Sequence, residues 1–235
     1  DGGAQNVLAD DYFNLEIDQA GTKTAQGAVN VAGTLTVQST GTPIYDIAAT
    51  TTTVTGTSTI AGTLNINGSG VYDANGDFAA SGAITMDGTA RLQLSAAGSG
   101  VSNLGTLDDA AGTVEYDGGG QDVFSDDYFN LVIDQSGNKT AQGTINVNGD
   151  FTADNSAVYK PSTFGTIVTG ATAFNNGAEL SFASGSSGVF DANGTFSDGV
   201  NITFHTSNGG NLRLQQSPNS FGTFTNNGTV RYDGG

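Results

Sequence analysis

The sequence predicts an all-β protein built as a parallel β-solenoid of about ten coils. Three observations point to that fold class: a long internal repeat, short runs that alternate apolar and polar residues, and the absence of helical spacing. The runs are rich in Thr, Val, Ile, Phe and Tyr, which fit half-buried strands, and the Gly, Asn and Asp between them favour turns. No segment repeats apolar residues three and four positions apart, so we expect almost no helix.

The long repeat has a period of 116 residues. Residues 1–37 return without a gap as residues 117–153, and 24 of the 37 positions are identical. Residues 112–119, Gly-Thr-Val-Glu-Tyr-Asp-Gly-Gly, also return at 228–235 with Arg in place of Glu. The sequence therefore predicts two repeats, residues 1–116 and 117–232, and residues 233–235 begin a third. We expect the molecule to continue in both directions, by sequence or by assembly.

A shorter period inside the repeat predicts the coils. Pairs of apolar residues separated by one residue recur five times in 116 residues, or about every 23 positions, within the roughly 20–30 residues of a solenoid coil. The pairs are Leu15/Ile17, Leu35/Val37, Leu64/Ile66, Ile84/Met86 and Val114/Tyr116. Glycine precedes four of them by two positions, at Gly33, Gly62, Gly82 and Gly112, which predicts corners with positive φ.

This spacing predicts about five coils per repeat. Because the spacing is uneven, two tandem β-sandwich domains are the alternative architecture, since ~100 residues is a common sandwich size.

The composition predicts a thin core and excludes several functions. Hydrophobic residues make up 36% of the chain, so the apolar side chains must be spread along it. The net charge is −17, from 23 acidic and six basic residues, so we expect no nucleic-acid partner. No apolar run approaches the ~20 residues of a membrane span, and we expect no membrane insertion. The absence of cysteine excludes disulfides and thiolate metal sites.

One stretch of each repeat carries a family resemblance. Its motifs are Tyr12-Phe13-Asn14-Leu15, Gly21-Thr22-Lys23-Thr24 and Gly33-Thr34-Leu35-Thr36-Val37. Residues 11–37 and 127–153 resemble the repeat unit of large β-strand-repeat, adhesin-like surface proteins of Bacteroidetes. The resemblance implies a bacterial protein that is extracellular or on the cell surface, with a right-handed solenoid. It implies no catalytic or ligand-binding residues.

The polar residues do not form a pattern typical of an enzyme. His205 is the only histidine, which excludes a His-based triad or a two-His metal site within the chain. A carbohydrate-active enzyme on a solenoid needs a unique pair of carboxylates, whereas the acids here largely recur from one repeat to the next. We therefore expect no enzymatic activity, with a solenoid carbohydrate-active enzyme as the alternative.

The function that these observations predict is structural. We expect a repeat segment of a long extracellular filament, stalk or matrix fibre, whose partners are further copies of the same repeats. The alternative is an adhesin segment that binds surface glycans or other cells. That alternative predicts an exposed row of aromatic residues, for which Phe164, Phe174, Phe221 and Phe224 are the candidates.

Paired acids are the candidate metal ligands. Asp10 and Asp11 recur as Asp126 and Asp127, close to glycine-rich turns. Crowded carboxylates on such turns suit Ca²⁺, which takes six to eight oxygen ligands. The alternative is that these aspartates cap turns through hydrogen bonds to their own backbone.

The two lysines of the repeated Gly-x-Lys-Thr motif also need partners. Lys23 and Lys139 occupy equivalent positions in the two repeats. We expect each to pair with a nearby acid, such as Asp18 or Asp134, in an exposed ion pair that stabilises the fold by ~0–1 kcal/mol.

Overall fold

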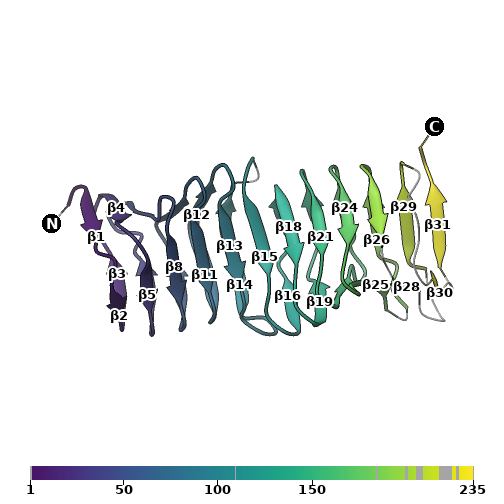
Figure 1. Cartoon of the computed structure of the whole chain (residues 1–235), viewed down its shortest axis with the longest axis horizontal. Coiled ribbons are helices and arrows are strands. Elements are labelled where there is room, and N and C mark those ends of the chain that lie inside the picture. Colours follow the sequence, from purple (N-terminus) through teal and green to yellow (C-terminus); the bar gives the residue numbers. More distant parts are fainter. Residues whose placement is uncertain are drawn as a thin grey trace. The chain divides into compact units, whose positions relative to one another are not determined.

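The protein is an all-β parallel β-solenoid of about ten turns, as its alternating sequence predicts (Figure 1). The computed structural model describes residues 2–108, 110–183, 185–198, 201–204, 209–216, 224–225 and 228–234. Every pairing observed between these strands is parallel and joins segments about 20 residues apart, so the alternative of two β-sandwiches is wrong. None of these residues belongs to a helix that could cross a membrane.

The chain divides into two compact units, Asp1–Glu115 and Tyr116–Gly235. In unit 1 the strands stack in three columns, and each coil contributes one strand to each column. The first column contains β1 (Gln5–Val7), β4 (Gly21–Ala25), β7 (Pro43–Asp46) and β10 (Thr63–Ile66). The second contains β2 (Asp11–Tyr12), β5 (Val29–Val31), β8 (Thr51–Val54), β11 (Val71–Ala74), β13 (Arg91–Leu94) and β15 (Thr113–Tyr116). The third contains β3 (Leu15–Ile17), β6 (Leu35–Val37) and β9 (Ser58–Ile60).

Two longer strands of unit 1 connect the third column to the first. The N-terminal half of β12 (Phe78–Met86) pairs with β9 and its C-terminal half pairs with β10. β14 (Val101–Leu107) follows β12 around the same corner with two register shifts. β12 therefore belongs to two faces of the coil, because the chain bends at Gly82 without an intervening loop.

Unit 2 repeats the three-column arrangement. One column contains β16 (Gln121–Val123), β19 (Gly137–Ala141), β22 (Ala157–Lys160), β25 (Glu179–Phe182), β28 (Asn201–Phe204) and β30 (Phe224–Thr225). The next contains β17 (Asp127–Tyr128), β20 (Ile145–Val147), β23 (Gly165–Val168), β26 (Val189–Ala192), β29 (Asn211–Leu214) and β31 (Thr229–Tyr232). The last contains β18 (Asn130–Ile133), β21 (Phe151–Ala153), β24 (Thr172–Phe174) and β27 (Phe196–Asp198).

The core of each unit is a narrow stack of inward-pointing side chains. Alternate residues of most strands are buried, as in β6 and β10, because successive side chains of a strand point to opposite faces. In unit 2 the stack is aromatic: Phe151 lies within 5.6 Å of Tyr159, Phe174 and Phe190, measured between ring centroids. The predicted apolar pairs therefore lie on strands, but in different columns: Leu35/Val37 in the third, Leu64/Ile66 in the first and Val114/Tyr116 in the second.

Two predictions about the coils need correction. The apolar pairs lie on different faces, so their mean spacing of about 23 residues is not the length of one coil; paired residues of neighbouring coils are 18 to 24 positions apart, as in Gln5↔Lys23 and Thr172↔Phe196. The predicted cause of the corner glycines is also wrong at three of four positions. Gly112 has a φ of 80°, but Gly33, Gly62 and Gly82 are not among the positive-φ glycines. At these three, a Cβ atom would collide with polar atoms of the preceding coil, such as the carbonyl oxygen of Gly62 below Gly82.

Candidate interaction site on the first coil

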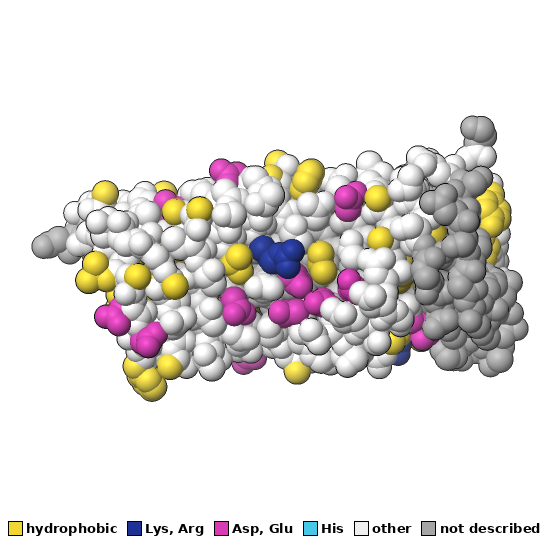
Figure 2. Space-filling model, in the orientation of Figure 1, with side chains coloured by type: hydrophobic (Ala, Val, Ile, Leu, Met, Phe, Trp, Pro, Cys, Tyr) yellow, Lys and Arg dark blue, Asp and Glu magenta, His cyan; other side chains and the backbone are white. Residues whose placement is uncertain are grey.

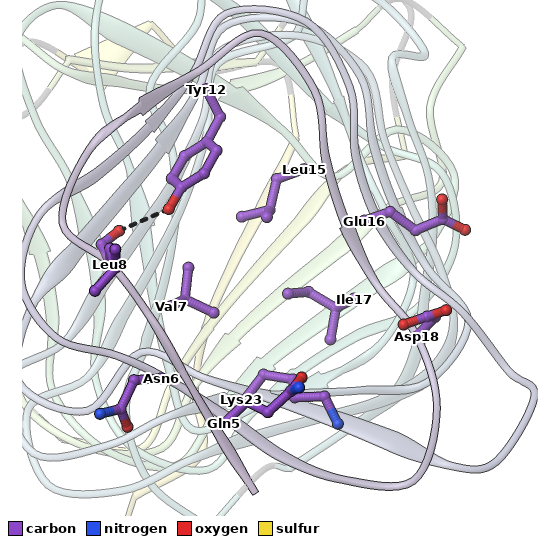
Figure 3. Close-up of a pocket in the computed structure, with 10 residues that line it drawn as sticks. All are labelled: Gln5, Asn6, Val7, Leu8, Tyr12, Leu15, Glu16, Ile17, Asp18 and Lys23. Carbon is purple, nitrogen blue, oxygen red and sulfur yellow. Dashed lines mark hydrogen bonds between the residues drawn. The ribbon is translucent and has the colours of Figure 1, made fainter. Parts of the chain in front are cut away.

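The first coil of unit 1 surrounds an open pocket of about 330 Å³. Val7, Tyr12, Leu15 and Ile17 point into the space within the coil, and Glu16 points away from it (Figure 3). β1, β2 and β3, which form this coil, are each at the end of a column. The residues that line the pocket are Gln5, Asn6, Val7, Leu8, Tyr12, Leu15, Glu16, Ile17, Asp18 and Lys23.

This coil is more exposed than its counterpart in the second repeat. Tyr12 and Leu15 are half-buried, whereas the equivalent Tyr128 and Leu131 are fully buried. Leu8 is 65% exposed and Phe13 is 77% exposed. The first coil therefore exposes core side chains beside strand edges that pair with no further described strand.

In unit 2, the side chain that covers the equivalent coil is Tyr116. The Phe124 N–H donates to the Tyr116 hydroxyl at 3.1 Å, and the Tyr128 hydroxyl donates to the Phe124 carbonyl oxygen at 2.6 Å. The Tyr116 hydroxyl lies 3.1 Å from that of Tyr128 and is therefore the donor between them. Burial raises the pKa of Tyr116 to about 12 and that of Tyr128 well above its usual value. In the first coil, the matching contact is the Tyr12 hydroxyl donating to the Leu8 carbonyl at 3.0 Å.

The counterpart of Tyr116 one repeat later is Tyr232. It ends β31, which pairs with β29 so that Leu214 is opposite Tyr232. Its side chain is 59% exposed, whereas Tyr116 is completely buried. The two equivalent tyrosines therefore differ in burial.

The two repeated lysines bind backbone carbonyls and are buried, which corrects the predicted exposed ion pairs. The Lys23 Nζ donates to the carbonyl oxygens of Gly3 and Ala20, both at 2.9 Å. The Lys139 Nζ donates to those of Gly118 at 2.6 Å, Asp134 at 2.7 Å and Gln135 at 3.1 Å. Asp134 therefore contributes its main-chain oxygen and not its carboxylate. Burial lowers the pKa of Lys139 to about 8, opposed by the negative charges of Asp134 and Asp117.

The four predicted calcium ligands form hydrogen-bonded turns. Asp10 accepts a bond from the Asp11 N–H at 2.8 Å, and Asp11 accepts one from the Asn30 side chain at 2.7 Å. Asp126 and Asp127 repeat the arrangement, and Asn146 donates to Asp127 at 2.6 Å. No cluster of three or more His, Cys, Asp or Glu with metal-binding geometry occurs in the described part of the chain. Calcium binding stays a prediction from the sequence pattern.

The structure also contains recurring hydrogen bonds between neighbouring coils that were not predicted from the sequence. Acids of one coil accept hydrogen bonds from asparagines of the next: Asp46 from Asn67 at 2.9 Å, Asp134 from Asn155 at 2.7 Å and Asp154 from Asn176 at 2.6 Å. In the sequence, these hydrogen bonds correspond to an Asp followed by an Asn about 20 residues later, and that pattern could have predicted them.

The buried hydrogen-bonded Tyr–Thr pairs were not predicted from the sequence either, for a different reason. Tyr45 lies 2.8 Å from Thr52, and Tyr159 lies 2.7 Å from Thr166, measured between hydroxyl oxygens. Both members of the second pair are offset by 114 residues from the first, and not by 116. A gap-free comparison of the repeats therefore does not align them.

The aromatic candidates for an adhesive surface do not form a row where they are described. Phe174 is packed in the core, and Phe164 is 36% exposed. Phe221 and the side chain of Phe224 lie outside the described residues, as does His205.

No protein-family model matches the chain, and the comparisons with curated proteins and with solved structures found no match.

Proposed function

We propose that the chain is a structural repeat segment of a long extracellular filament, stalk or matrix fibre composed of further copies of the same repeat. The observation that supports the proposal is the recurrence of the same contacts in both units. Lys23 and Lys139 each donate to backbone carbonyl oxygens, and Asp11 and Asp127 each accept a hydrogen bond from an asparagine of the next coil. Repeat solenoids bury their core by stacking each unit on its neighbours.

The contacts between coils support a mechanical role. Within each unit, neighbouring coils are joined by parallel backbone ladders on three faces, and some of them also by acid–asparagine hydrogen bonds. Under a load along the stacking direction, the hydrogen bonds between two neighbouring coils act in parallel and share the force.

Electron microscopy of the native material, with antibody labelling to locate it on the cell surface, tests this proposal. We expect thin, unbranched fibres. Their axial period should be roughly 27 Å, from between five and six coils per repeat and a rise of about 4.8 Å per coil. Compact, isolated particles in place of fibres would contradict the proposal, and so would labelling confined to the cell interior.

A further inference from the structure

We propose that the corner between β22 and β23 of unit 2 binds an anionic saccharide through Lys160, Phe164 and Ile167. Such a site goes beyond the proposed structural role, because it gives the segment a ligand of its own. The corner lies within the stack, where described strands flank it on both sides, β19 and β25 around β22 and β20 and β26 around β23.

The backbone of this corner is the same in both units, at positions 114 residues apart. Ala48 and its equivalent Ser162 have φ values of 49° and 60°. The Phe164 N–H donates to the Pro161 carbonyl oxygen at 3.1 Å, and the equivalent bond in unit 1 is also 3.1 Å long. From the next coil, the Val189 N–H donates to the Phe164 carbonyl oxygen at 3.0 Å, and the equivalent bond in unit 1 is 2.9 Å long. One turn therefore supports two different sets of side chains.

The side chains differ only where they face outward. Inside the coil the tyrosine–threonine pair is kept, as Tyr45 with Thr52 in unit 1 and Tyr159 with Thr166 in unit 2. At the surface three residues are exchanged: Asp46, Thr50 and Thr53 of unit 1 are replaced by Lys160, Phe164 and Ile167. Because the inward pair is kept, the packing of the core does not explain this exchange. An acid and two small polar residues have given way to a cation and two large apolar side chains.

The two apolar side chains are accessible to a ligand. Phe164 is 36% exposed and Ile167 is 41% exposed. A Cβ atom at Gly165, between them in the sequence, would meet no atom within 4 Å, so the space beside the backbone is open there. The other large hydrophobic side chains that are exposed in the described part of the chain belong to the first coil and to β31. The face of an aromatic ring carries partial negative charge and attracts C–H groups, which line one face of many sugar rings.

Lys160 supplies the positive charge of the site. It ends β22 and is half-buried, and no acid among the described residues forms an ion pair with it. In unit 1 the carboxylate of Asp46 accepts a hydrogen bond from Asn67 at 2.9 Å, a bond that a lysine cannot accept. A lysine without an acidic partner, in a chain with a net charge of −17, is suited to a charge-assisted hydrogen bond with an external anion.

The size of this surface favours a sugar over a protein. Two exposed apolar side chains and one ammonium group cover far less than the ~800 Å² per partner of a standard protein interface. Asn146 and Asp191 are opposite Ile167 on the neighbouring strands and give the site polar edges. A uronate residue combines a C–H face for Phe164 with a carboxylate for Lys160.

Isothermal titration calorimetry of the purified chain tests the site with hexamers of galacturonate, glucuronate and mannuronate. In about 0.15 M salt, which screens the other charges of the chain beyond ~8 Å, we expect at least one hexauronate to bind more tightly than uncharged cellohexaose. Phe164→Thr installs the residue of unit 1, and Lys160→Met removes the charge but keeps the length of the side chain. Each should weaken uronate binding roughly tenfold. Thr53→Ala, at the position of unit 1 equivalent to Ile167, is the matched control and should leave binding unchanged.

Three results would overturn the site: no binding of any hexauronate, variants that bind as tightly as wild type, or hexaglutamate bound as tightly as the sugars, which would assign an acidic peptide instead. Thermal melts show which variants are folded, and only folded variants are compared. Ile167→Thr is a second apolar variant and should also weaken binding. Native fibres test the structural role alone and these titrations test the site alone, so the failure of one is distinguishable from the failure of the other.

Discussion

At the scale of single residues, each buried tyrosine of the core has a hydrogen-bond partner for its hydroxyl. Five of the seven tyrosines have a pKa raised by burial, and their hydroxyls bond to Thr52, Ser58, Thr166, the Phe124 backbone or one another. A buried hydroxyl without a partner would destabilise the fold by ~1–3 kcal/mol. The paired hydroxyls allow a large aromatic ring to fill the narrow coil without that penalty.

These tyrosines predict how stability depends on pH. Burial raises the pKa of Tyr45 and Tyr116 to about 12, above the ordinary value of 10.0. Below pH 10 both folded and unfolded chains hold these protons, and the contribution of the tyrosines to stability is complete. Between pH 10 and pH 12 the unfolded chain releases them first. Each such tyrosine then lowers the free energy of unfolding by up to ~1.4 kcal/mol per pH unit.

A pH series of thermal melts, with tyrosinate absorbance recorded in parallel, checks this prediction. Ionisation of the buried tyrosines should coincide with unfolding, and Tyr45→Phe should make the alkaline loss of stability less steep. Ionisation well before the loss of β-structure would show that these hydroxyls are accessible to solvent in the folded state.

At the scale of elements, the closeness of stacked coils determines which residues can form a corner. β12 passes through its corner at Gly82, and a Cβ atom there would overlap the Gly62 carbonyl oxygen of the coil below. We expect Gly82→Ala to force the two coils apart and to destabilise unit 1 by about 2–4 kcal/mol, within the range of severe backbone substitutions.

Thermal melts with hydrogen exchange along β10 and β12 measure this effect. Gly165→Ala is the matched control. A Cβ atom at that glycine of β23 meets no atom within 4 Å, and the melting temperature should stay within about 2 °C of wild type, the shift expected for under 1 kcal/mol. Equal melts for the two variants would show that the corner tolerates a side chain.

The strands could be predicted from sequence, but their assignment to columns could not. Alternation shows that Leu35 and Leu64 point inward, and the structure confirms that both are buried. It does not show which of three faces each strand joins, because inward pairs occur on every face. The lysine sites were missed for a related reason. Backbone carbonyl oxygens bind Lys23 and Lys139, and next to each site a glutamine has positive φ, at Gln19 and Gln135, which no side-chain pattern marks.

At the scale of the whole molecule, the excess of acids is a source of repulsion within the chain. The chain has 23 acidic and six basic residues, and acidic side chains lie scattered over the surface shown in Figure 2. Charges in such an arrangement repel one another mostly through solvent, where salt screens them beyond a Debye length of ~8–10 Å at about 0.1–0.15 M ionic strength. Added salt should therefore stabilise the fold.

Comparison of sodium with calcium at matched ionic strength separates screening from metal binding. We expect NaCl to raise the melting temperature by ~2–4 °C, the shift that about 1 kcal/mol produces in a chain of this size, and CaCl₂ to do the same. The reason is that the carboxylates of Asp10, Asp11 and Asp127 already accept hydrogen bonds, and each aspartate pair offers fewer oxygens than the six to eight that Ca²⁺ takes. An additional rise with calcium alone, lost in an Asp11→Asn and Asp127→Asn double variant, would instead place a calcium site at these turns. Asp46→Asn removes a carboxylate from a different acid–asparagine hydrogen bond and is the control, since it should not change the response to calcium.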